Sequence, residues 1–294
     1  NGNVSIDGGT IKLDGNYPTG TENVALGNTA LDSGSLSGAY NTAIGSASMT
    51  ANTSGERNVA VGRTSLEANL GGSFNVASGY GALRLNTSGG SNTAIGYNAM
   101  LANQTGEGNT AVGKGALDAN NPGDNNVAIG KLSLSGNTTA DNNTAVGTCA
   151  LKTNTTGTEN VAVGLCALTA NTTASNNVAV GRKALATNTT GTHNVALGFN
   201  SQFSTTEGLC NISVGGGSLQ SNTTGCYNIG IGRFANCANT TSNNNVAVGH
   251  ESLKVNTAAN NTAVGYNALT ANTSGTENTA VGLCSLVSNQ TGNS

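Results

Sequence analysis

Two histidines and six cysteines are the side chains in this 294-residue sequence that are best suited to nucleophilic or metal chemistry. His193 and His250 lie far apart in the chain, and neither stands at a spacing typical of a metal site or of a nucleophile with its base. The sequence therefore predicts no enzyme, no catalytic residue, no metal site and no cofactor.

The composition limits the other classes of function. Only 9% of the residues are charged and 3% are aromatic, there is no Trp, and Gly numbers 43. The net charge of −3 is too small to indicate a nucleic-acid partner or an anionic membrane surface. No run of 18 apolar residues exists, so we expect no membrane insertion.

A short repeat organises almost the whole chain. Motifs such as NVAVG and NTAIG recur sixteen times, 17 residues apart except for one interval of 18 and one of 16. We number the positions of each repeat from the first residue of the motif, which is always Asn. These position-0 residues are Asn23, Asn41, Asn58, Asn75, Asn92, Asn109, Asn126, Asn143, Asn160, Asn177, Asn194, Asn211, Asn228, Asn245, Asn261 and Asn278.

A repeat of this length is too short for a helical hairpin. Its β-branched residues alternate with Ala and are bounded by Gly and Asn, as in strands and turns. We therefore predict an all-β fold, a parallel β-roll or β-solenoid of about sixteen 17-residue coils stacked about 4.8 Å apart. The repeat array covers residues 23–294, and residues 1–22 are interpreted as an N-terminal cap or the end of a preceding shaft segment.

Position 4 is Gly in every repeat, which predicts a turn with positive φ or a close approach of two backbones. We assign this structural role to Gly27, Gly62, Gly96, Gly113, Gly147, Gly164, Gly181, Gly249, Gly265 and Gly282. The Asn columns at positions 0 and 11 are expected to stack as amide ladders.

Positions 1 and 3 of the strand point to one side and position 2 points to the other. We expect position 3, together with Leu at position 8, to fill the coil, so that the small residue at position 2 faces a partner chain in a homotrimer. This trimer-facing column contains Ala25, Ala60, Ala94, Ala111, Ala145, Ala162, Ala179, Ala247, Ala263 and Ala280. The alternative is a monomeric solenoid whose narrow interior is lined by these alanines.

Position 5, directly after the turn glycine, collects long side chains. It holds five of the eleven basic residues and three of the six tyrosines. Its members are Arg63, Tyr80, Tyr97, Lys114, Lys131, Arg182, Phe199, Arg233, His250 and Tyr266. Stacked coils would align them as a surface stripe able to bind a glycan or lipopolysaccharide. The alternative is that a turn is simply where long side chains leave the core.

Two further features are local. Cys149 and Cys166 share position 6 in adjacent repeats, but the other cysteines form no pattern of staples, and we expect free thiols. The repeats from Asn194 to Asn244 break several columns, for example at Gln202 and Ser213. We interpret these breaks as drift, with a local functional insertion as the alternative.

The motifs NVAVG, NTAVG and NTAIG resemble the NSVAIG-type repeats of trimeric autotransporter adhesin heads, the YadA-like family. The longer unit NTAVGYNALTANTSGTEN is also similar to repeats in tail fibres and related structural proteins of marine phages. The resemblance covers residues 23–294. It implies a left-handed β-roll, three chains around one axis, and a role in surface attachment.

From the repeat and the resemblance together we expect a virion structural protein, a segment of a phage tail fibre or similar appendage. It would be a rigid homotrimeric spacer that contacts other virion fibre or tail proteins and contributes to attachment to a host-surface glycan. The alternatives are the head of a bacterial trimeric surface adhesin, located on the cell surface, and a monomeric β-solenoid such as an ice-binding protein.

Overall fold

The structure, a computed structural model, describes residues 22–293, and these residues contain no helix. None of them therefore forms a helix long and apolar enough to cross a bilayer. Nearly all of the predicted N-terminal cap or shaft end lies outside the described residues. The chain divides into two compact units, residues 1–125 and 126–294.

The strands of the first unit are three residues long and occupy positions 1 to 3 of each repeat. They are β1 (Val24–Leu26), β2 (Thr42–Ile44), β3 (Val59–Val61), β4 (Val76–Ser78), β5 (Thr93–Ile95) and β6 (Thr110–Val112). Within this unit each strand pairs in parallel with its neighbours in chain order, with equivalent residues opposite each other, such as Val59 and Val76.

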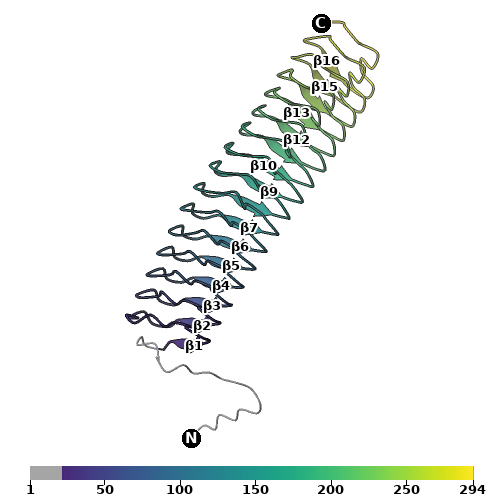
Figure 1. Cartoon of the computed structure of the whole chain (residues 1–294). Helices are drawn as coiled ribbons and strands as arrows, with labels where there is room; N and C mark the ends of the chain where they lie inside the picture. Colours follow the sequence, from purple (N-terminus) through teal and green to yellow (C-terminus); the bar gives the residue numbers. More distant parts are fainter. Residues whose placement is uncertain (1–21, 294) are drawn as a thin grey trace, which may run out of the picture. The chain divides into compact units, whose positions relative to one another are not determined.

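The second unit repeats this arrangement with β7 (Val127–Ile129), β8 (Thr144–Val146), β9 (Val161–Val163), β10 (Val178–Val180), β11 (Val195–Leu197), β12 (Ile212–Val214), β13 (Ile229–Ile231), β14 (Val246–Val248), β15 (Thr262–Val264) and β16 (Thr279–Val281). Its strands also pair in chain order and in register. In each unit the repeats follow one another as successive coils (Figure 1). The predicted parallel β-solenoid, with one repeat to each coil, is thus confirmed.

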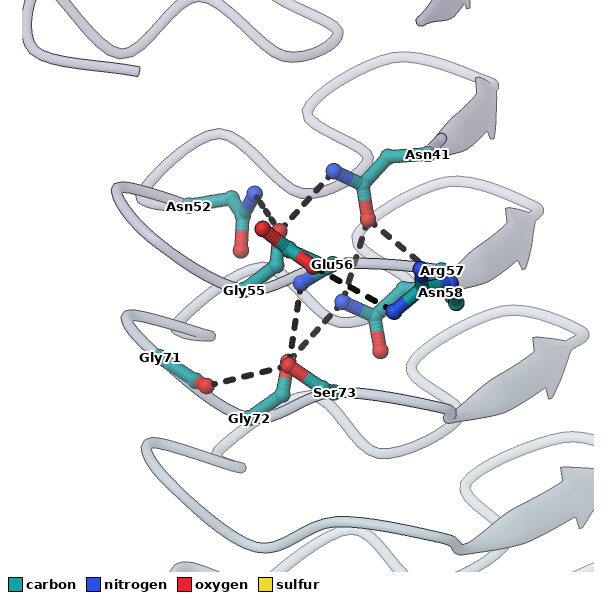
Figure 2. A network of polar contacts seen from close by, with 9 residues as sticks. All are labelled: Asn41, Asn52, Gly55, Glu56, Arg57, Asn58, Gly71, Gly72 and Ser73. Carbon is teal, nitrogen blue, oxygen red and sulfur yellow. Dashed lines mark hydrogen bonds and ion pairs between the residues drawn. The ribbon is translucent and has the colours of Figure 1, made fainter. Parts of the chain in front are cut away.

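Position-0 asparagines hold each coil closed and join it to the next. The side-chain Nδ2 of Asn41 donates to the carbonyl oxygen of Gly55 at 2.9 Å, at position 14 of the same coil. Its Oδ1 accepts the backbone N–H of Asn58 at 3.0 Å, at position 0 of the following coil. Figure 2 shows this network, which Asn58 continues by donating to Gly72. The position-0 asparagines Asn41 to Asn261 are fully buried, so these amides replace the water that the turn carbonyls would otherwise need.

Position-11 asparagines form a second ladder inside the same turn. Asn52 Nδ2 donates to Gly55 O at 3.0 Å, so this one carbonyl accepts from both asparagine columns (Figure 2). Asn69 Nδ2 then donates to Asn52 Oδ1 at 2.7 Å, which links the two coils directly. The predicted amide ladders are therefore present, and Asn41, Asn52 and Asn69 each bond both their own coil and a neighbouring one.

The turn glycines at position 4 have φ between +126° and +139°. A Cβ at Gly79 would lie 2.5 Å from the carbonyl oxygen of Gly96, in the same column one coil later. Both the positive φ and the close approach of the neighbouring backbone exclude any larger residue here. This explains why the column is glycine in every repeat.

The turn after Gly at position 4 also places non-glycine residues at positive φ. Thr64 and Leu66 have φ of 55° and 50°, at positions 6 and 8 of one coil. The N–H of Thr64 donates back to Ser46 O at 3.0 Å, whereas the N–H of Leu66 donates forward to Ala82 O at 3.0 Å. These residues thus hydrogen-bond to both the preceding and the following coil. The inter-coil hydrogen bonds offset the cost of a left-handed backbone conformation in residues other than glycine.

The orientation of the strand corrects the sequence-based expectation. The position-2 residues Ala60, Ala94, Ala111, Ala145, Ala162, Ala179, Ala247, Ala263 and Ala280 are between 0% and 2% exposed, and Ala25 in the first coil is half-buried. They line the interior together with the leucines of position 8, whereas positions 1 and 3 point outward. A 17-residue coil is so narrow that a methyl group fills the space opposite Leu, and the branched side chains lie outside. The alanine column therefore cannot be the face that meets another chain.

We predict that Asn75→Ala destabilises the protein by about 2–5 kcal/mol, because it leaves buried backbone groups without partners. Asn75 Nδ2 donates to Gly89 O at 2.9 Å, and its Oδ1 accepts from Asn92 N–H at 3.0 Å. Chemical denaturation of the wild type and the variant measures the difference. Asn28→Ala is the matched control, since Asn28 is exposed, and equal stability of the two variants would contradict the ladder's role.

Candidate interaction surfaces

The outward face of each sheet carries two parallel columns of β-branched residues. At position 3, Val61 is 38% exposed and Ile95 42% exposed, and at position 1 Val59 is 38% exposed. Neither column contains a charged residue in any of the sixteen repeats. Contiguous apolar surface of this kind usually marks an interface. We call this surface the outward face; sequence reasoning placed it inside the coil because the width of the coil was not considered.

In the first unit, the position-5 side chains form a continuous run of contacts. The rings of Tyr80 and Tyr97 stack with centroids 5.4 Å apart and an angle of 10° between their planes. Arg63 lies over Tyr80 at 5.8 Å, and Lys114 lies over Tyr97 at 5.3 Å. The run is thus two rings closed at each end by a cation, which is a favourable arrangement for both groups.

In the second unit the same column is interrupted. Arg182 lies over Phe199 at 5.4 Å, and His250 stacks on Tyr266 with centroids 5.4 Å apart. Arg233 instead lies over the neighbouring ring of Phe234 at 4.5 Å. The remaining predicted member, Lys131, is followed in its column by Thr148. Column 5 therefore forms separate groups rather than one stripe.

These contacts change what column 5 can offer to a ligand. The ring faces of Tyr80 and Tyr97 are covered by each other and by the flanking cations, so a sugar cannot stack on them. The two residues are still 41% and 51% exposed, which leaves their edges and hydroxyl groups in solvent. Hydrogen bonding and charge, rather than stacking, are the contacts available here.

A second column with the same chemistry precedes the strands at position −1, and sequence reasoning missed it. Arg57 lies between the rings of Tyr40, at 5.3 Å, and Phe74, at 5.4 Å. Its signal is visible in the sequence, because these three residues are one repeat apart and each immediately precedes a position-0 asparagine. Columns −1 and 5 therefore lie at the two ends of the strands, with the outward face between them.

The residues suited to catalysis or metal binding are dispersed. His193 lies at position −1 and His250 at position 5 of different coils. Among residues 22–293, no group of three or more His, Cys, Asp or Glu side chains is placed to hold a metal ion. All six cysteines, which fall in this range, are free thiols, and burial raises the pKa of the Cys237 thiol.

The irregular coils contain a matched pair of exceptions. Gln202 replaces Leu at position 8, and its Nε2 donates to Val195 O and to Ser213 Oγ, both at 2.9 Å. Ser213 in turn replaces Ala at position 2 and contacts the hydroxyl of Ser201. The Gln202 amide nitrogen and the Ser201 and Ser213 hydroxyls thus bond one another, whereas Gln202 Oε1 and the side-chain amide of Asn236, also at position 8, have no hydrogen-bond partner among the described residues.

Asp118 is a half-buried carboxylate whose Oδ1 has no hydrogen-bond partner in the protein. Burial raises the pKa of this carboxyl group above its ordinary value, because the ionised form is poorly solvated. The stability that the neutral form provides is present below the unfolded-state pKa and is lost as the pH rises through the folded-state pKa.

We therefore predict that Asp118→Asn is modestly more stable than the wild type at pH 7, and that the difference disappears near about pH 3, where the carboxyl group is neutral in both states. Thermal unfolding of both proteins across this pH range measures the effect. Glu207→Gln makes the same change of charge at an exposed residue away from the strand ends and is the control. A difference that stays constant with pH would contradict the assignment to Asp118.

Comparison with known proteins gives no assignment: no protein-family model and no curated protein matches the chain.

Proposed function

We propose that this chain is a segment of a homotrimeric fibre, in a phage tail fibre or similar virion appendage, where it acts as a stiff spacer. The observation that carries the proposal is the outward face. Its two columns are apolar or Thr in every repeat except for Ser78, and they contain no charge. A surface so long and so free of charge is costly to leave in water, and burial against further chains removes that cost.

A further copy of the same chain is the partner that fits this face. The columns repeat with every coil in each unit. The side chains of a second array with the same coil spacing therefore lie opposite those of the first at every coil along the face. An ordinary globular partner lacks this period. The resemblance of the motifs to trimeric adhesin heads and phage fibres supports three copies in particular. A bacterial adhesin head has the same requirements and is the alternative location for the same assembly.

The ladders support the role of a spacer. Each coil is joined to its neighbours by backbone bonds and by two columns of buried amides, so the coils within a unit are not free to bend independently. A repeat array of this kind is stable through nearest-neighbour contacts alone. It can therefore extend by adding coils without needing a larger core.

Light scattering after size exclusion, under reducing conditions, is the first test. We expect three times the chain mass of 28.9 kDa. We further predict that Val61→Asp combined with Ile95→Asp yields a folded particle of 28.9 kDa, because both side chains point outward and a buried carboxylate would be costly in the interface.

The matched control for this experiment is Leu70→Asp with Leu85→Asp. These leucines are 49% and 42% exposed but lie outside the strands, so the assembly should persist. A wild-type mass near 28.9 kDa at all concentrations would exclude the fibre proposal. The outward face would then be the candidate surface of a monomeric solenoid, and a thermal-hysteresis measurement on the same sample would test ice binding.

We assign the contribution to host attachment to the exposed hydroxyl groups of column 5. The prediction is that Tyr80→Ser with Tyr97→Ser lowers binding to lipopolysaccharide or intact host cells about tenfold, since two adjacent polar contacts are lost. Binding is measured on an immobilised surface, with the assembly state checked in parallel. Tyr40→Ser is the control, a 47% exposed tyrosine in the other column. Equal binding of all variants would remove column 5 from the proposal.

A further inference from the structure

Charges are segregated between the two ends of the strands. Position −2, before the strand, holds four acidic residues in the array and no basic one, whereas position 5, after it, holds five basic residues and no acidic one. In the first unit the acidic side chains include Glu56 and Glu107, and the basic ones are Arg63 and Lys114. In the first unit each coil that carries such a cation also carries a carboxylate seven residues earlier, with the strand between them, whereas Arg182 and Arg233 in the second unit have Ser175 and Cys226 at that position.

These groups are exposed and available. Arg63, Lys114 and Glu107 are exposed and make no ion pair within residues 22–293. The carboxylate of Glu56 contacts the neighbouring Arg57 at 3.4 Å, with both side chains about half exposed (Figure 2). An exposed pair of this kind contributes little and re-forms easily with another partner. The backbone N–H of Glu107 donates to the carboxylate of Asp124, the next member of column −2, at 2.7 Å.

Symmetry determines what each end of a strand meets. If copies are related by rotation about an axis parallel to the stack, with outward faces toward that axis, the end of each strand lies beside the beginning of the next copy's strand. Position 5 then meets position −2, and cations meet carboxylates. If instead two copies run antiparallel along the stack, position 5 meets position 5 and position −2 meets position −2. Like charges would then be opposed, which is unfavourable.

The same residues distinguish axial registers. With no shift, Arg63 faces Glu56 of the equivalent coil in the next copy. Lys114 likewise faces Glu107 of its equivalent coil. A shift of one coil brings Lys114 to Asp124 but places Arg63 opposite Ser73. No other shift satisfies both cations of the first unit. Apolar columns that repeat in nearly every coil cannot make this distinction, because shifting them by one coil restores almost the same contacts.

We propose that Arg63 and Lys114 pair with the partner subunit's Glu56 and the partner subunit's Glu107, and that these pairs set the parallel orientation and the axial register of the assembly. The inference rests on the proposed function, since it requires copies joined through the outward face. It uses the cations of column 5, whereas host attachment uses the tyrosine hydroxyls of the same column. The role corresponds to that of flanking charges beside an apolar seam in coiled coils.

The test is charge reversal with rescue. Arg63→Glu with Lys114→Glu should raise the concentration at which the full chain dissociates by about tenfold or more, because each contact becomes a repulsion. Glu56→Lys with Glu107→Lys should have the same effect. The fourfold variant that combines both pairs of substitutions restores attraction at every contact and should assemble like the wild type.

Sedimentation velocity over a dilution series measures dissociation, and circular dichroism verifies that each variant is folded. The effect of either double variant should shrink between about 0.05 M and about 0.5 M salt. Arg84→Glu with Lys152→Glu is the control, since it makes the same change of net charge at position 9, away from the strand ends.

The outcomes separate the two proposals. A wild-type trimer whose dissociation is unchanged in both double variants would overturn the pairing while leaving the fibre segment standing. A fourfold variant that assembles as poorly as the double variants would also overturn it, because non-specific charge effects would then explain the loss. A monomeric wild type would overturn the fibre segment, and the pairing with it.

Discussion

The fold depends on the buried asparagine at position 0. A coil of 17 residues has one three-residue strand, so most of its backbone lies in turns whose carbonyl and N–H groups cannot pair within a sheet. Asn41 meets this need twice, because its amide donates to a turn carbonyl of its own coil and accepts the N–H that begins the next one. An aspartate would lose the donor and bring a charge into the interior, and a serine would be too short to bridge both groups. The requirement explains a column that does not vary.

The narrowness imposed by these turns determines which residues face outward. With the turn glycines of adjacent coils in backbone contact, the interior has room for the small residues of positions 2 and 7 and one leucine side chain in each coil. The β-branched residues, which stabilise the strands, therefore lie on the outside. A repeat that satisfies its own core in this way necessarily presents apolar surface to its surroundings. The proposed assembly is thus a consequence of how small the coil is.

The period, the strands, the glycine turns and the asparagine ladders could be predicted from the sequence, because each follows from one residue type recurring in one column. Which side of the strand is buried could not, because Val59 and Ala60 are both apolar and only the volume of the coil separates them. The left-handed backbone at Leu66 was hidden for a different reason: leucine carries no preference for positive φ, and inter-coil hydrogen bonds select the conformation. The contact of Arg57 with Tyr40 and Phe74 could have been predicted, because the three residues are 17 positions apart. They were overlooked because each lies one residue before the Asn that begins the repeat motif.

In a repeat protein the axial register between two chains is poorly determined, because a coil can pair with several equivalent coils of the other chain at little cost. Within one chain, covalent connectivity determines the order in which the coils stack. Between chains, only the residues that differ from coil to coil can determine the register. Among these are the side chains of positions −2, −1 and 5, which lie at the ends of the strands, where variation costs the core nothing. The uniform columns therefore supply stability, and the variable columns beside the outward face are the part of the surface able to specify how copies align. For this reason the placement of Arg63 and Lys114 relative to Glu56 and Glu107 carries more information about assembly than the more numerous valines between them.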